Sequence, residues 1–352
     1  MEPNRLLLPL SWLYGGLVAA RNAAFDAGLL RSRRVGSCVI SVGNLTAGGA
    51  GKTPMVEYLA RRLMARGVRV AVVSRGYGRA SKGLVTVSDG SQVFVGADRG
   101  GDEPVQMART LKGLSVVVGE RRVDAASVAT GELGAEVVLM DDGFQHRYLR
   151  RDHDILVIDA RRDLRREPLL PAGYRREALS SLRRATMVVL TRAEGTVPPD
   201  WFAHLRQWYA GPLASCRVRV LGLYDAGDHR EIGRESVSAD PAFAFSGIGD
   251  HNGFIRSLEE FGVKVSGHRG FADHHRYTAG DLDGIVEAMR SSGATRAVTT
   301  EKDAVRLSAE PGVLQSLTRV RPLCYTRVAP EFVAGESNLD AIIESCVAGS
   351  KA

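Results

Sequence analysis

A glycine-rich segment near residue 50 carries the strongest chemical signal in this 352-residue sequence. It lies between a β-branched run and a helical stretch, and it ends in Gly51-Lys52-Thr53, as a Walker A loop does. Glycines let backbone N–H groups converge on phosphate oxygens, the lysine reaches the β and γ phosphates, and the hydroxyl holds Mg²⁺. We therefore predict an ATP-binding loop formed by Thr46, Ala47, Gly48, Gly49, Ala50, Gly51, Lys52 and Thr53.

One position departs from the Walker A pattern. Thr46 stands where GxxxxGK[ST] has its first glycine, which by itself weakens the match. The alternative is a glycine-rich turn that binds nothing, and the strand–loop–helix context disfavours it.

Two carboxylates follow a later apolar run, as in a Walker B strand. Residues 137–140 are apolar, and Asp141 and Asp142 come directly after them. Without the glycine-rich loop, these acids would be read as a solvated pair in a turn. Together with that loop they predict a Mg²⁺ site that includes Thr53 and at least one of the two aspartates.

The charge balance favours anionic partners. The sequence has 47 Lys and Arg against 40 Asp and Glu, and residues 147–184 alone hold eleven arginines and six acids. That region lacks the interleaved aromatics that stack on bases, so we rank lipid phosphate above nucleic acid. Arg175 and Arg176 are candidates for the rim of the site, with Glu177 assisting the metal.

Four cysteines lie far apart in the sequence. No CxxC pair is present, so the sequence predicts neither a zinc site nor a disulfide framework, and a reducing cytoplasm is the expected compartment. The four are Cys38, Cys216, Cys324 and Cys346.

Short β-branched runs alternate with helical stretches, which is typical of a doubly wound α/β domain with a parallel sheet. Strands are predicted at 38–43, 68–74, 115–118, 136–140, 154–159 and 187–191, and helices at 54–66, 103–111 and 121–133. The alternation at 84–95 around Asp89-Gly90 predicts a hairpin at the edge of the domain.

Gly195 and the prolines after it mark a plausible domain boundary. Strand-like runs resume at 218–223, 242–245 and 297–300, and residues 339–347 read as a terminal helix. We predict an N-terminal membrane-associated helix at 1–32, a P-loop domain at 33–195 and a smaller α/β domain at 196–352.

Residues 6–20 are almost wholly apolar and are flanked by Arg5 and Arg21. A run of about 15 residues is short for a membrane span, so an interfacial anchor is favoured. A signal peptide and a buried first helix of the domain are the alternatives.

Several further segments resemble the tetraacyldisaccharide 4'-kinases, the lipid A kinases of Gram-negative bacteria. The resemblance extends from the N-terminal apolar run to about Leu307, and the kinases' loop also lacks the first Walker A glycine. The segments are Ser74-Arg75-Gly76-Tyr77-Gly78-Arg79, Gly101-Asp102-Glu103-Pro104, Asp141-Asp142-Gly143-Phe144-Gln145-His146, Leu170-Pro171-Ala172-Gly173 and Thr300-Glu301-Lys302-Asp303.

The resemblance implies transfer of the ATP γ-phosphate to the 4'-hydroxyl of a tetraacylated glucosamine disaccharide 1-phosphate, at the cytoplasmic face of the inner membrane. It implies Asp102 as general base, His274 as its partner and Glu103 as a neighbour of the substrate, and it leaves open whether His274 or His275 faces the site. From the residues alone, Asp102 would be a helix N-cap as readily as a base. The remaining substrate residues that we expect are Arg75, His146 and Arg176.

Two other classes of protein remain as alternatives. A switch or partitioning NTPase would hydrolyse nucleotide and act on protein partners, but no guanine-reading NKxD segment is present, because Lys302 and Asp303 are adjacent. A membrane-bound protein that has lost catalysis is disfavoured by the intact Gly51-Lys52-Thr53. No obligate protein partner is evident.

The Lys52→Ala variant should lose transfer, because the loop's N–H groups cannot replace the charge nearest the β and γ phosphates. Transfer of label from ATP to the lipid acceptor is the measurement, and Lys264→Ala is a control outside the loop. Near-normal transfer by Lys52→Ala would sink the P-loop assignment.

Overall fold

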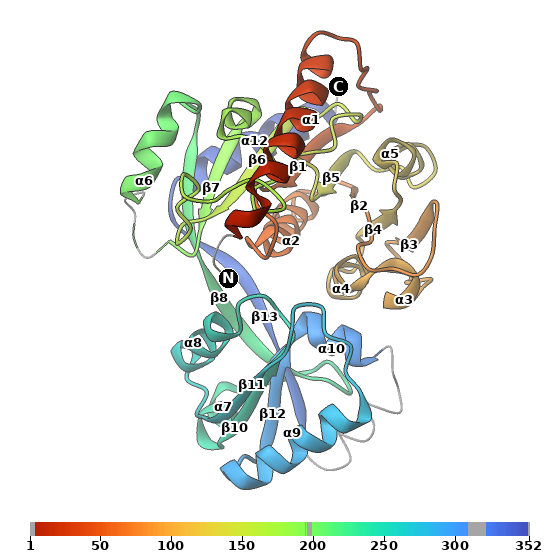
Figure 1. Ribbon diagram of the computed structural model, residues 1–352. Coiled ribbons are helices and arrows are strands. Elements are labelled where there is room, and N and C mark those ends of the chain that lie inside the picture. Colours follow the sequence, from red (N-terminus) through yellow and green to blue (C-terminus); the bar gives the residue numbers. More distant parts are fainter. Residues whose placement is uncertain (1–3, 194, 196–198, 309–321, 351–352) are drawn as a thin grey trace.

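One continuous sheet runs through both halves of the chain in the computed structural model, which describes residues 4–193, 195, 199–308 and 322–350 (Figure 1). The strand order is β11-β10-β12-β13-β8-β7-β6-β1-β5-β2-β4-β3, and β9 pairs with β8 outside this path.

The first half holds the parallel strands that the sequence predicts. They differ from the predicted ranges by at most two residues at either end, so the doubly wound α/β class is confirmed. These strands are β1 (Cys38–Gly43), β2 (Val70–Ser74), β4 (Ser115–Val118), β5 (Val137–Asp141), β6 (His153–Asp159) and β7 (Met187–Thr191).

The predicted hairpin at 84–95 is half correct. Its first arm is β3 (Val85–Asp89), which pairs antiparallel with β4 at the edge of the sheet. Its second arm is no strand, because only an isolated bridge joins Ser88 to Val93.

Helices cover both faces of these strands, which explains why the strands are apolar throughout. On one face α2 (Lys52–Met64) and α12 (Glu336–Ser350) pack over β1, and α4 (Asp102–Thr110) belongs to the same core cluster. On the other face α5 (Arg122–Gly131) packs against β2 and β4. The short α3 (Ala97–Gly100) precedes α4.

Two long strands carry the sheet from one half into the other. β8 (Leu213–Asp225) pairs with β7 at its start and antiparallel with β13 (Leu323–Ala334) along its length. Figure 1 shows both strands crossing between the halves. The second half adds β9 (Glu231–Ile232), β10 (Ala242–Ser246), β11 (Val265–Gly270), β12 (Arg296–Thr300), α7 (Arg234–Ala239), α8 (His251–Phe261), α9 (Ala279–Ser292) and α10 (Glu301–Ser308).

Packing groups several later residues with the first half. The core side chains of α6 (Asp200–Ala203) and η3 (His204–Gln207) join a cluster with β6 and β7, next to η2 (Leu179–Arg184). α12 also belongs to the first half, although it ends the chain. The hydrophobic core of the first half therefore includes residues beyond 195. The domain boundary at residue 195 stays a prediction.

The N-terminal helix α1 (Leu8–Asp26), preceded by η1 (Arg5–Leu7), has two different sides. On the inner side, Ser11 Oγ donates to the Leu169 carbonyl at 2.9 Å and Asn22 Nδ2 donates to Glu177 Oε2 at 2.9 Å. The outer side leaves Trp12 and Leu17 73% and 65% exposed. Of the helices in the described part of the chain, none has the length and apolarity needed to cross a bilayer.

The expectation of unpaired cysteines is wrong for two of the four. Cys38, at the start of β1, and Cys346, on α12, form a disulfide across a sequence separation of 308 residues. The fold brings together two residues that no spacing pattern connects. Cys216 and Cys324 are free and buried.

Candidate active site

The phosphate loop lies at the carboxyl end of β1, immediately before α2. Gly48 and Gly51 take positive φ values of 102° and 84°, which suit glycine. From Ala47 to Thr53 the loop lines a cleft of about 1040 Å³ between the two halves. Thr46 does not line this cleft: it is 7% exposed and makes an isolated bridge with Arg175.

Two side chains at the carboxyl end of β7 bind carbonyl groups of the loop. Thr191 Oγ1 donates to the Ala50 carbonyl at 2.8 Å, and Arg192 Nη1 donates to the Gly49 carbonyl at 2.7 Å. Both residues follow or end β7, and sequence reasoning did not single them out. These two bonds fix the backbone of the loop to the end of β7.

The two predicted aspartates sit in different electrostatic environments. Asp142 lies 3.5 Å from Lys52 Nζ and 2.8 Å from Arg176 Nη1. Burial acts to raise the pKa of Asp142, but Lys52 and Arg176 outweigh it and hold the pKa below its usual range. Burial, with Glu103 and Asp142 nearby, raises the pKa of Asp141 to about 7.

The opposite wall comes from α4 and the second half of the chain. Asp102 Oδ2 accepts from Arg306 Nε at 2.6 Å and lies 3.6 Å from His274 Nδ1. Burial acts to raise the pKa of Asp102, while hydrogen bonds from His274 and Arg306 lower it overall. His274 lines the cleft; Asp102 stands just behind it.

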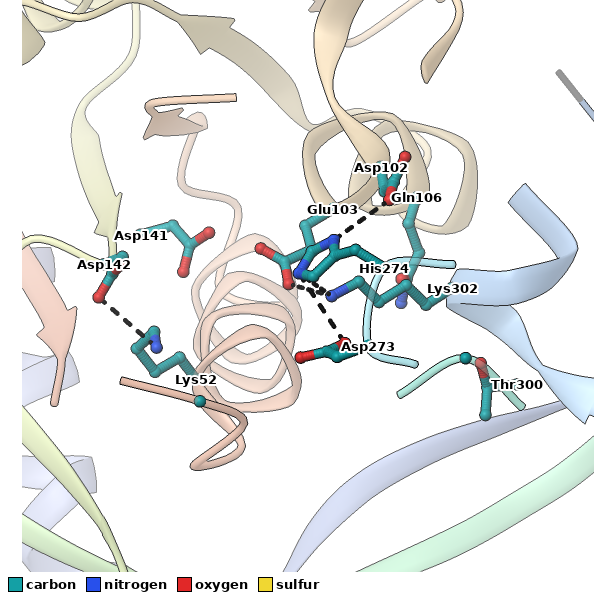
Figure 2. A network of polar contacts seen from close by, with 12 residues as sticks. Lys52, Asp102, Glu103, Gln106, Asp141, Asp142, Asp273, His274, Thr300 and Lys302 are labelled. Carbon is teal, nitrogen blue, oxygen red and sulfur yellow. Dashed lines mark hydrogen bonds and ion pairs between the residues drawn. The ribbon is translucent and has the colours of Figure 1, made fainter. Parts of the chain in front are cut away.

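Lys302 joins this wall to the first half of the chain. Its Nζ lies 2.9 Å from Glu103 Oε1 and 3.2 Å from His274 Nε2. Figure 2 shows Glu103 pointing from α4 into the space between Asp141 and His274. His275 instead lies 3.1 Å from Asp281 and stacks on Phe271, so His274 is the histidine that faces the cleft.

Two of the remaining predicted residues reach the cleft and one does not. Arg75 and His146 line it, and burial among arginines lowers the pKa of His146 to about 4. Glu177 does not line the cleft, and its Oε2 lies 2.9 Å from Arg184 Nη1 and accepts from Ser181. Its other oxygen, Oε1, is buried and has no hydrogen-bond partner among the described residues, so a role for Glu177 in a metal site stays a prediction.

A further acidic cluster lies deeper in the cleft and was missed in the sequence. Gln106 Nε2 donates to Glu57 at 3.1 Å and to Glu301 at 3.4 Å, and Arg327 Nε donates to Glu301 at 2.8 Å. Burial and the nearby Glu301 raise the pKa of Glu57 to about 8. Glu57 lies on the apolar face of α2. A charged residue among apolar ones on a helix face is the sequence signal that could have identified it as a functional candidate.

A phosphate loop on a parallel sheet, facing two aspartates and a carboxylate–imidazole pair across one cleft, defines a P-loop phosphotransferase. The sequence profile of the family described as Tetraacyldisaccharide-1-P 4'-kinase matches residues 3–348. The chain belongs to this family of kinases.

Individual relatives agree with this assignment. The tetraacyldisaccharide 4'-kinase of Anaeromyxobacter sp. (strain Fw109-5) is 42% identical over 97% of this chain and 92% of its own length. That of Chlorobium luteolum is 38% identical over 98% of both chains. Among solved structures, "apo" form LpxK from Aquifex aeolicus, crystallised in complex with ATP, has a TM-score of 0.79 at 33% identity, covering 97% of this chain and 99% of the other.

The buried Glu57 predicts a pH-dependent stability. Between its ordinary pKa of 4.5 and about 8, the folded protein keeps a proton that the unfolded chain has released. The free energy of unfolding should therefore fall as pH rises through this window. Glu57→Gln has no group that titrates in this window. Between pH 5 and about pH 8.5, the free energy of unfolding of the variant should therefore fall by ~1–3 kcal/mol less than that of the parent.

Urea unfolding at a series of pH values measures this effect. Glu132→Gln, at an exposed position, is the matched control and should keep the parent's pH profile. Identical pH slopes for the parent and Glu57→Gln would show that Glu57 is ionised in the folded protein.

Proposed function

We propose that this chain transfers the γ-phosphate of ATP to the 4'-hydroxyl of a tetraacyldisaccharide 1-phosphate, the reaction named for its family. One observation carries the proposal: Lys52 and the phosphate loop face Glu103 and His274 across a single cleft (Figure 2). A donor phosphate and an acceptor hydroxyl bound on these two walls would meet between them.

The residues around Lys52 also suit Mg²⁺. Asp141 is 2% exposed, and its Oδ1 has no hydrogen-bond partner among the described residues. An unpaired carboxylate oxygen beside the phosphate loop fits a hard cation, with the Thr53 hydroxyl as a second ligand. Bound there, Mg²⁺ would neutralise charge on the β and γ phosphates. Asp142, already paired with Arg176, would serve mainly to place Lys52.

Asp102 is proposed to receive the acceptor's proton. Its lowered pKa keeps it ionised at neutral pH but makes it a weak base. Phosphoryl transfer through a loose transition state asks little of a base, because the attacking hydroxyl keeps its proton until late. We infer that Asp102 and His274 act chiefly by orienting the hydroxyl, with Arg306 holding the carboxylate in place.

Asp102→Asn should lower kcat by roughly 10²- to 10⁴-fold while ATP affinity stays close to normal. His274→Ala should cost less, and the double variant should lose less than the product of the single losses, because the two residues act as a unit. Label transfer to a detergent-dispersed acceptor and nucleotide binding are measured in parallel. Asp98→Asn, an exposed acid on the preceding helix α3, is the control. Unchanged kcat in Asp102→Asn would leave this residue with a structural role only, through its ion pair with Arg306.

The same assay separates the kinase from a switch NTPase. A kinase should place label on the lipid and release little inorganic phosphate when the acceptor is omitted. Phosphate release at the same rate with and without the acceptor would favour the NTPase alternative.

The location proposed for this enzyme is the cytoplasmic surface of the inner membrane. Tyr14 and Arg21 of α1 line the cleft, while Trp12, Leu13 and Leu17 point outward with 73%, 63% and 65% of their surface exposed. An apolar face of this kind, next to the cleft, suits a helix lying in the interface beside a lipid acceptor.

Replacing Trp12, Leu13 and Leu17 together by Gln should weaken vesicle binding by about tenfold or more, because three apolar side chains no longer enter the bilayer. Activity on detergent-dispersed acceptor should be retained. This variant is sharper than deleting residues 1–25, since the deletion also removes Tyr14 and Asn22 from their contacts with Arg176 and Glu177.

Co-sedimentation with anionic vesicles measures the binding. The control changes the exposed Ala19 and Ala20 to Gln on the same helix. If the triple variant sediments with vesicles as strongly as the parent at high salt, the apolar face is not the membrane contact.

A further inference from the structure

Three residues with metal-binding side chains meet at the amino ends of two central strands of the sheet, opposite the ends that approach the phosphate loop. Cys38 and His153 are the first residues of β1 and β6, adjacent parallel strands whose opposite ends approach the phosphate loop. Cys346 comes from α12, which packs over β1. The two sulfurs and a ring nitrogen of His153 all lie within 4.8 Å of one another.

The chemistry of this cluster differs from that of the active site. Two thiolates and an imidazole are ligands for a thiophilic cation such as Zn²⁺, whereas Mg²⁺ prefers the carboxylate and hydroxyl oxygens of the cleft. The Ser345 hydroxyl lies 2.8 Å from His153 Nε2. A hydrogen bond at one ring nitrogen orients the imidazole and leaves the other nitrogen to bind a metal.

Burial gives the cluster a closed side and an open side. Cys346 is 1% exposed, while Cys38 and His153 are half-buried, so an ion has a route from solvent. The described residues contain no other group of three or more His, Cys, Asp or Glu side chains arranged in this way.

The sulfurs of Cys38 and Cys346 can either form the disulfide or, once reduced, bind a metal ion as thiolates, but they cannot do both at once. At the cytoplasmic location given under the proposed function, dithiol reductants keep most thiols reduced. A cellular dithiol would supply two electrons and two protons to the disulfide, giving two protein thiols and an oxidised dithiol. A cation would then displace the two thiol protons on binding.

We infer that reduced Cys38 and Cys346, with His153, form a Zn²⁺ site whose fourth position is taken by water. The site ties α12 to β1 and β6. It is a structural element, separate from the catalytic Mg²⁺, and it holds the last helix of the chain on the first half of the fold. Binding should therefore stabilise the protein without taking part in phosphate transfer.

Titration of the full-length protein with Co²⁺, in the presence of a phosphine reductant, tests the site. Thiolate ligands should produce a sulfur-to-cobalt charge-transfer band that saturates at about one Co²⁺ per chain and disappears when Zn²⁺ is added. Cys38→Ser and His153→Gln should each lose the band or weaken binding by about 100-fold. Ser345→Ala should weaken it by about 10-fold, because the Ser345 hydroxyl only orients the imidazole.

The control is the double variant Cys216→Ser/Cys324→Ser, which removes the two buried free thiols and should keep the band. Protein oxidised before the titration should show no band. The Tm of reduced protein should rise on adding Zn²⁺ in the parent and not in His153→Gln, whose half-buried position makes it the variant best able to fold.

A reduced parent protein with no band, or a band that persists in Cys38→Ser, would overturn the site. Because the readouts are absorbance and Tm, they are independent of whether the chain phosphorylates the proposed acceptor.

Discussion

The cost of burying acidic side chains in the cleft is the physical constraint on which the arrangement of this site depends. The cleft contains three buried acidic side chains, Glu57, Asp141 and Glu301, and two that are about a third exposed, Glu103 and Asp142. Each needs a partner because an isolated buried carboxylate is costly. Lys52 and Arg176 offset Asp142, and Lys302 offsets Glu103. Compensation is incomplete at Asp141, whose pKa rises to about 7. The unpaired oxygen of Asp141 is therefore suited to bind a cation.

Ion pairs also hold the two halves of the chain together. Asp102 and Glu103 on α4 pair with Arg306 and Lys302 on α10. On the other side of the phosphate loop, Asp250 at the start of α8 lies 2.8 Å from Arg161, which follows β6. β8 and β13 add a covalent and hydrogen-bonded link between the halves. These contacts therefore hold the second half of the chain against the domain that carries the phosphate loop.

The N-terminal helix contacts the site on one side and leaves large apolar side chains exposed on the other. Its inner side contacts the segment from Leu169 to Glu177, which also supplies Arg176 to Asp142. Its outer side presents large apolar residues. A lipid headgroup that moved along α1 from the proposed membrane interface would reach the cleft directly, because Tyr14 and Arg21 of the same helix line it.

Local patterns were sufficient for the strands, the principal helices and the phosphate loop, because side-chain periodicity and glycine placement act over a few residues. They were not sufficient wherever a contact joins distant parts of the chain. Glu177 accepts a hydrogen bond from Asn22 of α1, which is 155 residues away in the sequence. Cys38 and Cys346 meet only because α12 folds back over β1. Which side chains share a low-dielectric site depends on long-range packing, and packing sums many weak contacts that no short window of sequence contains.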